Sequence, residues 1–256
     1  RGMRLSTGGQ IDRSRPLDFR FDGVTYSGFH GDTLASALMA NGLKVVGRSF
    51  KYHRPRGIFS AGSEEPNALV TLGAGARAEP NVRATMQELF AGLEARSQNR
   101  WPSLDWDVME VNDLFADFLG AGFYYKTFMW PKAFWEKLYE PVIRRAAGLG
   151  ALSGQADPDA NEKAFAHCDL LVIGAGPAGL MAALQAGEAG GDVILCDEDR
   201  TPGGSLLSST EDVDGMAAPD WAAEVVARLE AMPNVTLRLR CMGAGVYDHG
   251  YVLGYE

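Results

Sequence analysis

The sequence predicts two kinds of fold in one chain, an α+β part followed by an α/β part with a parallel sheet. Short strands with alternating apolar and polar residues on either side of Asp22-Gly23 indicate the first part. A continuous apolar run at 170–173, followed by closely spaced glycines, indicates the second. A polar, proline-containing stretch at 153–163 separates them. The expected domains are residues 1–95, a helical connector at 96–165, and residues 166–256.

Composition excludes several classes of function. The chain has 256 residues, of which 46% are hydrophobic and 22% are charged, and its formal net charge is -9. The negative charge argues against general binding to nucleic acid or to anionic membranes. The sequence contains no run of about 18 apolar residues, so no membrane span is predicted. The first residues, RGMRLSTGGQ, lack the apolar core of a secretory signal. We therefore expect a cytoplasmic protein.

The first part is expected to begin with a hairpin and a helix. Residues 18–21 and 24–26 alternate across Asp22-Gly23, a pair suited to a type I′ turn. Asp32 or Thr33 can cap a helix that runs to about residue 40, where Asn41-Gly42 ends it. Another strand is expected at 68–72. Hairpin, helix and further strands in this order are typical of a β-grasp fold, as in plant-type ferredoxins.

The connector carries weaker signals. Residues 112–119 are expected to form a short helix, and residues 131–147 a longer one whose apolar residues recur near helical spacing. Pro141 lies inside the longer helix and predicts a kink or a division into two helices. The polar stretch at 153–163 then reads as a linker.

A dinucleotide-binding pattern opens the second part. Residues 170–173, LLVI, suit a strand buried on both faces of a parallel sheet. Glycines at 174, 176 and 179 then give the spacing G-x-G-x-x-G, which allows a tight turn, close approach of a diphosphate, and close packing of the next helix. That helix is expected at 177–188, with its positive dipole end toward the phosphates. A second strand is expected at 192–196.

Two acids follow the second strand, where a carboxylate can bind the adenosine ribose. Asp197 is the first choice, while Glu198 can equally be a solvated surface residue. An acid at this point repels a 2′-phosphate, so NAD or FAD is favoured over NADP, and the spacing does not separate those two. Gly203-Gly204 either contributes to the site or only turns the chain. The candidate cofactor-binding residues are Gly174, Ala175, Gly176, Pro177, Ala178, Gly179, Asp197, Glu198, Gly203 and Gly204.

The remaining residues predict an incomplete Rossmann-type domain. A helix at 220–232 and a strand at 235–241 complete three parallel strands, the first mononucleotide half, and residues 246–255 begin an antiparallel excursion. No nucleophile, base and orienting group can be assembled from the sequence, so no catalytic residue is predicted. No metal site is predicted either, because the four histidines form no close ligand pair.

Four segments carry a family resemblance. They are HRPRGIFSAGSEEPNALV at 53–70, AGFYYKTFMWP at 121–131, YEPVIRRAAGLG at 139–150 and VIGAGPAGL at 172–180. Together they resemble the alpha subunits of heterotetrameric sarcosine oxidases, and more distantly iron-sulfur relatives among amine and amino-acid dehydrogenases. Those alpha subunits are far longer and continue into a folate-binding domain, so the resemblance implies an N-terminal fragment.

The resemblance also implies a ferredoxin-like domain without a cluster. Iron-sulfur members of the wider group carry C-x4-C-x2-C after the HRPRG segment, and the corresponding residues here are Ser60, Glu65 and Ala68. Thiolates are the expected ligands of a [2Fe-2S] cluster in such a loop. All three cysteines of the chain lie elsewhere, at 168, 196 and 241.

For function, the resemblance implies an oxidoreductase subunit. In that family the assembly of alpha, beta, gamma and delta subunits oxidises sarcosine to glycine, hydrogen peroxide and formaldehyde or methylenetetrahydrofolate. Amine oxidation occurs at FAD on the beta subunit, FMN lies between alpha and beta, and NAD is bound by alpha. The chain alone is expected to be inactive. An FAD-binding subunit of a related amine or amino-acid dehydrogenase and a non-catalytic nucleotide-binding scaffold are the alternatives.

Two further clusters have competing interpretations. Lys51, His53, Arg54 and Arg56 could bind a phosphate, but a surface loop that pairs with Glu64, Glu65 or a partner subunit is favoured. Tyr124, Tyr125 and Lys126 could line a flavin site, but an aromatic-rich stretch of this kind is more often core or interface.

Overall fold

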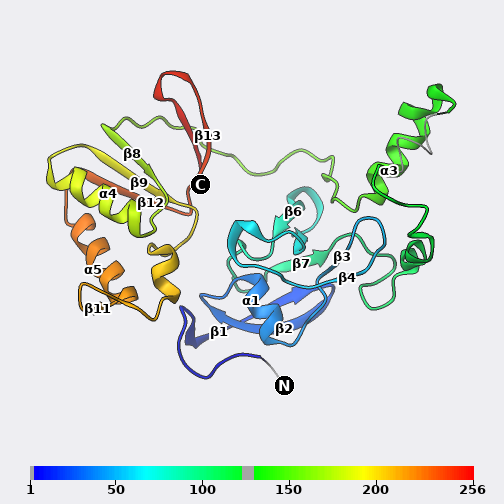
Figure 1. Cartoon of the computed structure of the whole chain (residues 1–256), viewed down its shortest axis with the longest axis horizontal. Coiled ribbons are helices and arrows are strands. Elements are labelled where there is room, and N and C mark those ends of the chain that lie inside the picture. The colour runs from blue at the N-terminus through cyan, green and yellow to red at the C-terminus, as the bar shows by residue number, and fades with distance from the viewer. Residues whose placement is uncertain (1–2, 123–129) are drawn as a thin grey trace. The chain divides into compact units, whose positions relative to one another are not determined.

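A computed structural model describes residues 3–122 and 130–256. The chain forms two compact units, Arg1–Ala160 and Asn161–Glu256 (Figure 1). Most of the aromatic segment at 121–131 lies outside the described residues, so the hypothesis that Tyr124, Tyr125 and Lys126 line a flavin site is not addressed by the structure.

The first unit is built on a five-stranded sheet in the order β2-β1-β7-β5-β6. Its strands are β1 (Asp12–Phe21), β2 (Val24–His30), β5 (Leu69–Leu72), β6 (Glu79–Arg83) and β7 (Glu94–Ser97). β1 and β7 are parallel, and the other neighbours are antiparallel. The helix α1 (Leu34–Ala40) buries Leu34 and Leu38 in the same core as Phe19, Phe21 and Val70. An apolar helix face on a mixed sheet therefore supplies the hydrophobic core of this unit.

Local signals predicted the start of this unit correctly. Asp22 and Gly23 have φ of 48° and 82°, as a type I′ turn requires, and the hairpin is confirmed. Thr33 is the N-cap of α1, in a capping box with Ser36. Asp32, the other candidate cap, is buried and accepts a hydrogen bond from the Phe29 amide instead.

The connector is less regular than predicted. A 3-10 helix covers Val108–Phe115, and the predicted helix at 131–147 consists of a 3-10 turn at Lys132–Phe134, a π-helical turn at Trp135–Tyr139 and α3 (Glu140–Ala146). Pro141 occupies the first turn of α3, where its missing N–H group costs no hydrogen bond. The expectation of a division at Pro141 is confirmed, but a continuous amphipathic helix is not formed.

The second unit contains a parallel three-stranded sheet in the order β12-β9-β8. Its strands are β8 (Leu170–Ile173), β9 (Val193–Asp197) and β12 (Val235–Leu239), and α4 (Pro177–Glu188) and α5 (Ala218–Glu230) pack on it and on each other (Figure 1). The prediction that β8 is buried on both faces is wrong, since Leu170 is 39% and Ile173 51% exposed. β8 is an edge strand of this sheet, with a neighbour on one side.

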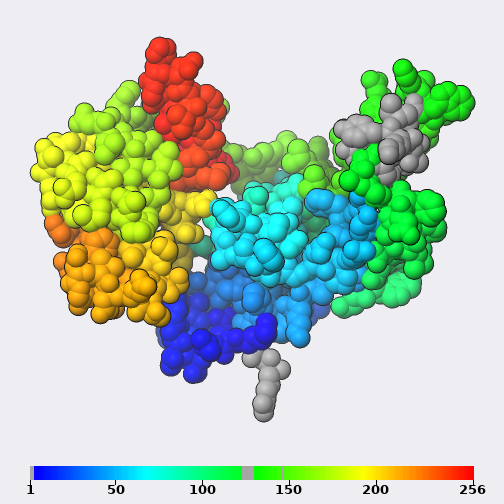
Figure 2. Space-filling view, in the orientation of Figure 1, coloured from blue at the N-terminus to red at the C-terminus, as the bar shows by residue number. Residues whose placement is uncertain are grey.

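Short antiparallel pairs complete the fold. β3 (Gly47–Arg48) pairs with β4 (Pro55–Arg56), β10 (Asp212–Val213) with β11 (Met216–Ala217), and β13 (Met242–Val246) with β14 (Val252–Tyr255). The β13–β14 hairpin, red in Figure 2, projects from the second unit as a separate two-stranded sheet. Within the described part of the chain, no helix has the length and apolar character needed to cross a bilayer.

Candidate dinucleotide-binding site

The predicted glycine turn lies at the junction of β8 and α4. Gly174 follows the last residue of β8 with φ of 100°, and its amide donates to the Cys196 carbonyl at 2.8 Å. Gly176 is the N-cap of α4, with no side-chain hydrogen bond, and Pro177 begins the helix. The first amides of α4 and the positive end of its dipole therefore face the turn, an arrangement suited to binding a phosphate.

The three glycines differ in the space around them. A Cβ on Gly179 would lie 1.8 Å from the Gly174 carbonyl oxygen, so this glycine lets α4 pack closely on the turn. A Cβ on Gly174 or Gly176 would meet nothing within 4 Å. Open space above these two residues leaves room for a diphosphate to approach the main chain.

Asp197, at the end of β9, is bound to the glycine turn. One carboxylate oxygen accepts a hydrogen bond from the Ala175 amide, and the other accepts one from the Asp199 amide at 2.7 Å. A carboxylate has about four lone-pair directions, so two backbone donors leave acceptors for ribose hydroxyls. Glu198 is exposed. The geometry thus favours Asp197 as the ribose-binding acid.

The glycine pair after β9 also reaches the turn. The Gly203 amide donates to the Ala175 carbonyl at 2.8 Å, and a Cβ on Gly204 would lie 3.1 Å from the Cα of Gly176. Gly203-Gly204 therefore packs directly against the turn, so it shapes the site in addition to turning the chain. Pro177 and Ala178 are exposed in the first turn of α4 beside it.

Two buried cysteines, Cys196 and Cys241, bond through their main chains to residues of the site. The sequence does not indicate that they belong to it. The Cys196 carbonyl accepts from Gly174, and the Cys241 amide donates to the Asp197 carbonyl at 2.9 Å. Burial raises the pKa of both thiols, and for Cys196 the adjacent Cys241 raises the pKa further. Both groups are thus neutral and serve as packing beneath the turn. No sequence spacing signals this contact, because Cys241 follows a different strand.

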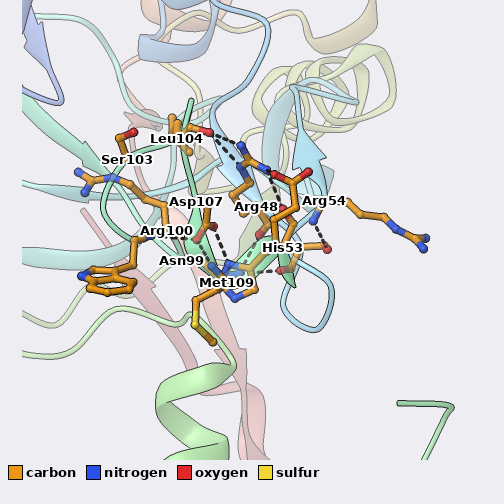
Figure 3. A network of polar contacts seen from close by, with 12 residues as sticks. Arg48, His53, Arg54, Asn99, Arg100, Ser103, Leu104, Asp107 and Met109 are labelled. Atoms are coloured by element: carbon orange, nitrogen blue, oxygen red, sulfur yellow. Dashed lines mark hydrogen bonds and ion pairs between the residues drawn. The ribbon is translucent and has the colours of Figure 1, made fainter. Parts of the chain in front are cut away.

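The basic segment predicted in the first unit is held by the connector (Figure 3). The buried Arg48 donates to the Leu104 carbonyl and pairs with Glu110 at 3.0 Å. His53 Nδ1 lies 2.6 Å from an Asp107 carboxylate oxygen, and both side chains are buried. The other Asp107 oxygen accepts from the Trp101 and Met109 amides at 3.2 and 3.0 Å.

The more exposed cations of this segment, the half-buried Lys51 and the exposed Arg54, also have internal partners. Arg54 pairs with Asp113, and Lys51 donates to the Leu119 carbonyl at 2.7 Å. These partners lie in the connector, whereas the Glu65 carboxylate, one of the expected partners, accepts hydrogen bonds from amides of its own loop. Arg56, with Arg48, Lys51 and Tyr52, lines a cavity of about 380 Å³ in the first unit.

Family comparisons agree with the two-part organisation. Residues 14–100 match a 2Fe-2S iron-sulfur cluster binding domain, and residues 169–241 match an FAD dependent oxidoreductase family. The second match begins at Asp169 and ends at Cys241, and so contains the entire glycine turn with Asp197 and Gly203-Gly204.

Comparison with curated proteins gives longer matches. The chain is 66% identical over 251 residues to sarcosine oxidase subunit alpha of Rhizobium meliloti (strain 1021), which covers 98% of this chain. The chain is a homologue of sarcosine oxidase alpha subunits. It is also 36% identical to the subunit of that name from Corynebacterium sp. (strain U-96), again over 98% of this chain. This chain spans about a quarter of the length of these relatives, 25% of the first and 22% of the second.

A solved structure supports the fold. The crystal structure of L-proline dehydrogenase from P. horikoshii matches 95% of this chain and 37% of its own chain, with a TM-score of 0.56 and 19% sequence identity. At this identity the likeness concerns the fold. This chain therefore shares a mixed α/β fold with the L-proline dehydrogenase chain.

Proposed function

We propose that the second unit is a Rossmann-type domain that binds NAD at the glycine turn, within the alpha subunit of a multisubunit sarcosine oxidase. The observation that supports this proposal is the hydrogen bond from the Ala175 amide to the Asp197 carboxylate, since an acid beside the amides of a glycine turn can serve a ribose next to a diphosphate. The identity of 66% to a sarcosine oxidase subunit alpha supports the assignment of the parent enzyme.

Each part of the site has a role toward the nucleotide. The N-terminal amides of α4 bind the diphosphate. Gly174 and Gly176 carry no side chain, so the diphosphate oxygens can come close to the main chain. Asp197 accepts hydrogen bonds from the ribose hydroxyls and repels a 2′-phosphate, which selects against NADP. Gly203 and Gly204 pack against the turn and help to fix its conformation. NAD supplies hydride-accepting chemistry when bound, and no residue of this chain is proposed to act on the amine.

The activity of the parent enzyme is the oxidative demethylation of sarcosine to glycine, a reaction on a CH-NH donor. In this proposal FAD on the beta subunit carries the amine oxidation, FMN lies between alpha and beta, and gamma and delta subunits complete a cytoplasmic heterotetramer. Folate binds in a part of the alpha subunit beyond this chain. The 256-residue chain alone is inactive toward sarcosine.

FAD is the second candidate for the glycine turn. The match of residues 169–241 to FAD dependent oxidoreductases favours it, and the glycine spacing serves both dinucleotides. In this alternative the chain belongs to a flavin-containing amine or amino-acid dehydrogenase.

Identifying the bound nucleotide separates the candidates. Nucleotides released by denaturing the purified assembly are identified by mass, for the wild type and for Gly176→Ala. NAD in the wild type, and its loss in the variant, is the expected result. If FAD is the nucleotide lost in the variant, FAD and not NAD binds at the glycine turn. If the variant retains the nucleotide fully, the proposed location is wrong.

We also propose that the first unit contains a β-grasp domain, at about residues 1–95, that holds no [2Fe-2S] cluster, and that residues 96–165 connect this domain to the nucleotide domain. Ser60, Glu65 and Ala68 supply no thiol to the loop. Among the described residues, no group of three or more His, Cys, Asp and Glu side chains is arranged to hold a metal ion. Iron and labile-sulfide analysis of the purified chain tests this proposal, and stoichiometric iron would contradict it.

A further inference from the structure

Glu65 is a buried acid in the loop where the matched family binds its cluster. The residue is 1% exposed and follows the 3-10 turn Gly62–Glu64. One carboxylate oxygen accepts hydrogen bonds from the Phe59 and Ser60 amides, and the other accepts one from the Asn67 amide, each at 2.7 Å. These three backbone donors, together with the Ala68 amide, therefore converge on one side chain.

This environment keeps the carboxyl group charged. Burial raises the pKa of Glu65, but hydrogen bonds from the Ser60, Asn67, Phe59 and Ala68 amides outweigh burial and lower the pKa below its ordinary value. A buried charge without such donors would be strongly unfavourable. The loop is thus shaped around an anion.

The residues around Glu65 include those at the cluster-ligand spacing. Plant-type [2Fe-2S] loops use C-x4-C-x2-C and a fourth, more distant cysteine. Ser60, Glu65 and Ala68 have this spacing, and Thr85 is brought to the same loop, where its hydroxyl donates to the Gly62 carbonyl at 2.6 Å. The Ser60 hydroxyl oxygen is buried with no hydrogen-bond partner in the structure. Serine, glutamate, alanine and threonine do not provide a thiolate cage.

We infer that the Glu65 carboxylate takes the place of the iron-sulfur cluster in this loop, as an internal anion that organises the loop amides and excludes iron. A cluster held by four thiolates is a negatively charged group, and loop amides that face such a group need a replacement when it is lost. Glu65 comes from within the loop and supplies that charge without a metal. This inference rests on the proposed absence of a cluster.

Two glutamates in neighbouring positions provide a matched test in the full chain. Glu65→Gln keeps the side-chain shape but replaces one acceptor oxygen by a donor group, whereas Glu64→Gln changes an exposed glutamate of the adjacent turn. Hydrogen exchange of the loop amides and thermal unfolding are measured for both, together with iron content. In Glu65→Gln we expect the amides of Phe59, Ser60 and Asn67 to exchange at least about tenfold faster.

The expected thermal result is a fall of about 5 °C or more in the unfolding temperature of Glu65→Gln, because hydrogen bonds to a charged acceptor are lost. Glu64→Gln should leave both measurements unchanged. Equal protection of the loop amides in Glu65→Gln and wild type would overturn the role of Glu65. Stoichiometric iron in the wild type would instead overturn the absence of a cluster, so the two failures are distinguishable.

Discussion

The Asp197 carboxylate accepts a hydrogen bond from the Ala175 amide, which joins the end of β9 to the middle of the glycine turn. Asp197 also accepts a hydrogen bond from the amide of Asp199, two residues further along the chain. The residue therefore has a structural and a binding role: it fixes the turn and presents its remaining acceptors to a ribose. Substitutions should affect both roles, and a neighbouring acid provides the comparison.

Replacement of Asp197 by alanine should weaken nucleotide binding at least tenfold, about 1.4 kcal/mol, because ribose acceptors are lost and the Ala175 amide loses its partner. Binding of NAD to the purified chain is measured by calorimetry. Glu198→Ala is the control, since the Glu198 side chain is exposed, and it should bind as the wild type does. If NAD binding is weakened equally in both variants, the ribose does not bind at Asp197. In the intact assembly, unchanged turnover after loss of the nucleotide would favour a scaffold role for it.

The second prediction compares two glycines of the same turn. Gly176 has φ of -72° and open space at its Cβ position, so Gly176→Ala should fold normally but place a methyl group where the diphosphate binds. Gly179→Ala should instead destabilise the second unit by about 1–3 kcal/mol, because its methyl group overlaps the Gly174 carbonyl. Urea unfolding and NAD binding separate the two effects. A stable Gly176→Ala that binds NAD normally would exclude the proposed diphosphate position.

Short-range patterns are enough to predict several elements of both units. The turn at Asp22-Gly23, the cap at Thr33 and the bounds of α4 depend on residues within a few positions of each other. The glycine turn belongs to the same class, since its conformation is set by the adjacent strand and helix. Such elements are encoded locally, and the structure confirms them.

Contacts between distant residues could not be predicted in the same way. His53 and Asp107 are 54 positions apart, and their bond is not indicated by any periodicity. The exposure of Ile173 depends on the order of strands in the sheet, while the sequence shows only that the strand is apolar. The sequence shows Glu65 at the place of a cysteine ligand, but its burial depends on loop amides that converge on it only in the folded chain.

The third prediction concerns the His53–Asp107 pair. Asp107→Ala should destabilise the first unit by about 3–5 kcal/mol, because it leaves a buried imidazole and the Trp101 and Met109 amides without their acceptor. Urea unfolding followed by tryptophan fluorescence measures the loss. Glu110→Ala removes a half-exposed partner of Arg48 and should cost less than about 1 kcal/mol. A loss in Asp107→Ala as small as that expected for Glu110→Ala would show that the buried pair contributes little.

The fourth prediction is a pH dependence. The pKa of Glu65 is lowered from its ordinary value of 4.5 because amide hydrogen bonds outweigh burial. A lowered folded-state pKa gives stability that is present above the unfolded-state value and lost as the pH falls through the folded-state value. The stability difference between wild type and Glu65→Gln should therefore be constant near neutral pH and shrink below about pH 4.5. Urea unfolding at several pH values measures it, and a difference that grows on acidification would contradict the assignment.

The fifth prediction restores the cluster ligands. A variant with Ser60→Cys, Glu65→Cys, Ala68→Cys and Thr85→Cys places four thiols around the loop and removes its internal anion. After anaerobic treatment with iron and sulfide it should hold about two iron and two sulfide atoms per chain, because the loop amides already suit an anionic group. Iron and sulfide analysis with visible absorption measures incorporation.

A three-cysteine variant that retains Glu65 is the matched control for this experiment. The carboxylate then still occupies the loop amides and one ligand is missing, so incorporation should fall to a small fraction of that in the four-cysteine variant. The wild type should hold no cluster under the same conditions. Full incorporation with Glu65 in place would show that its carboxylate does not exclude the metal.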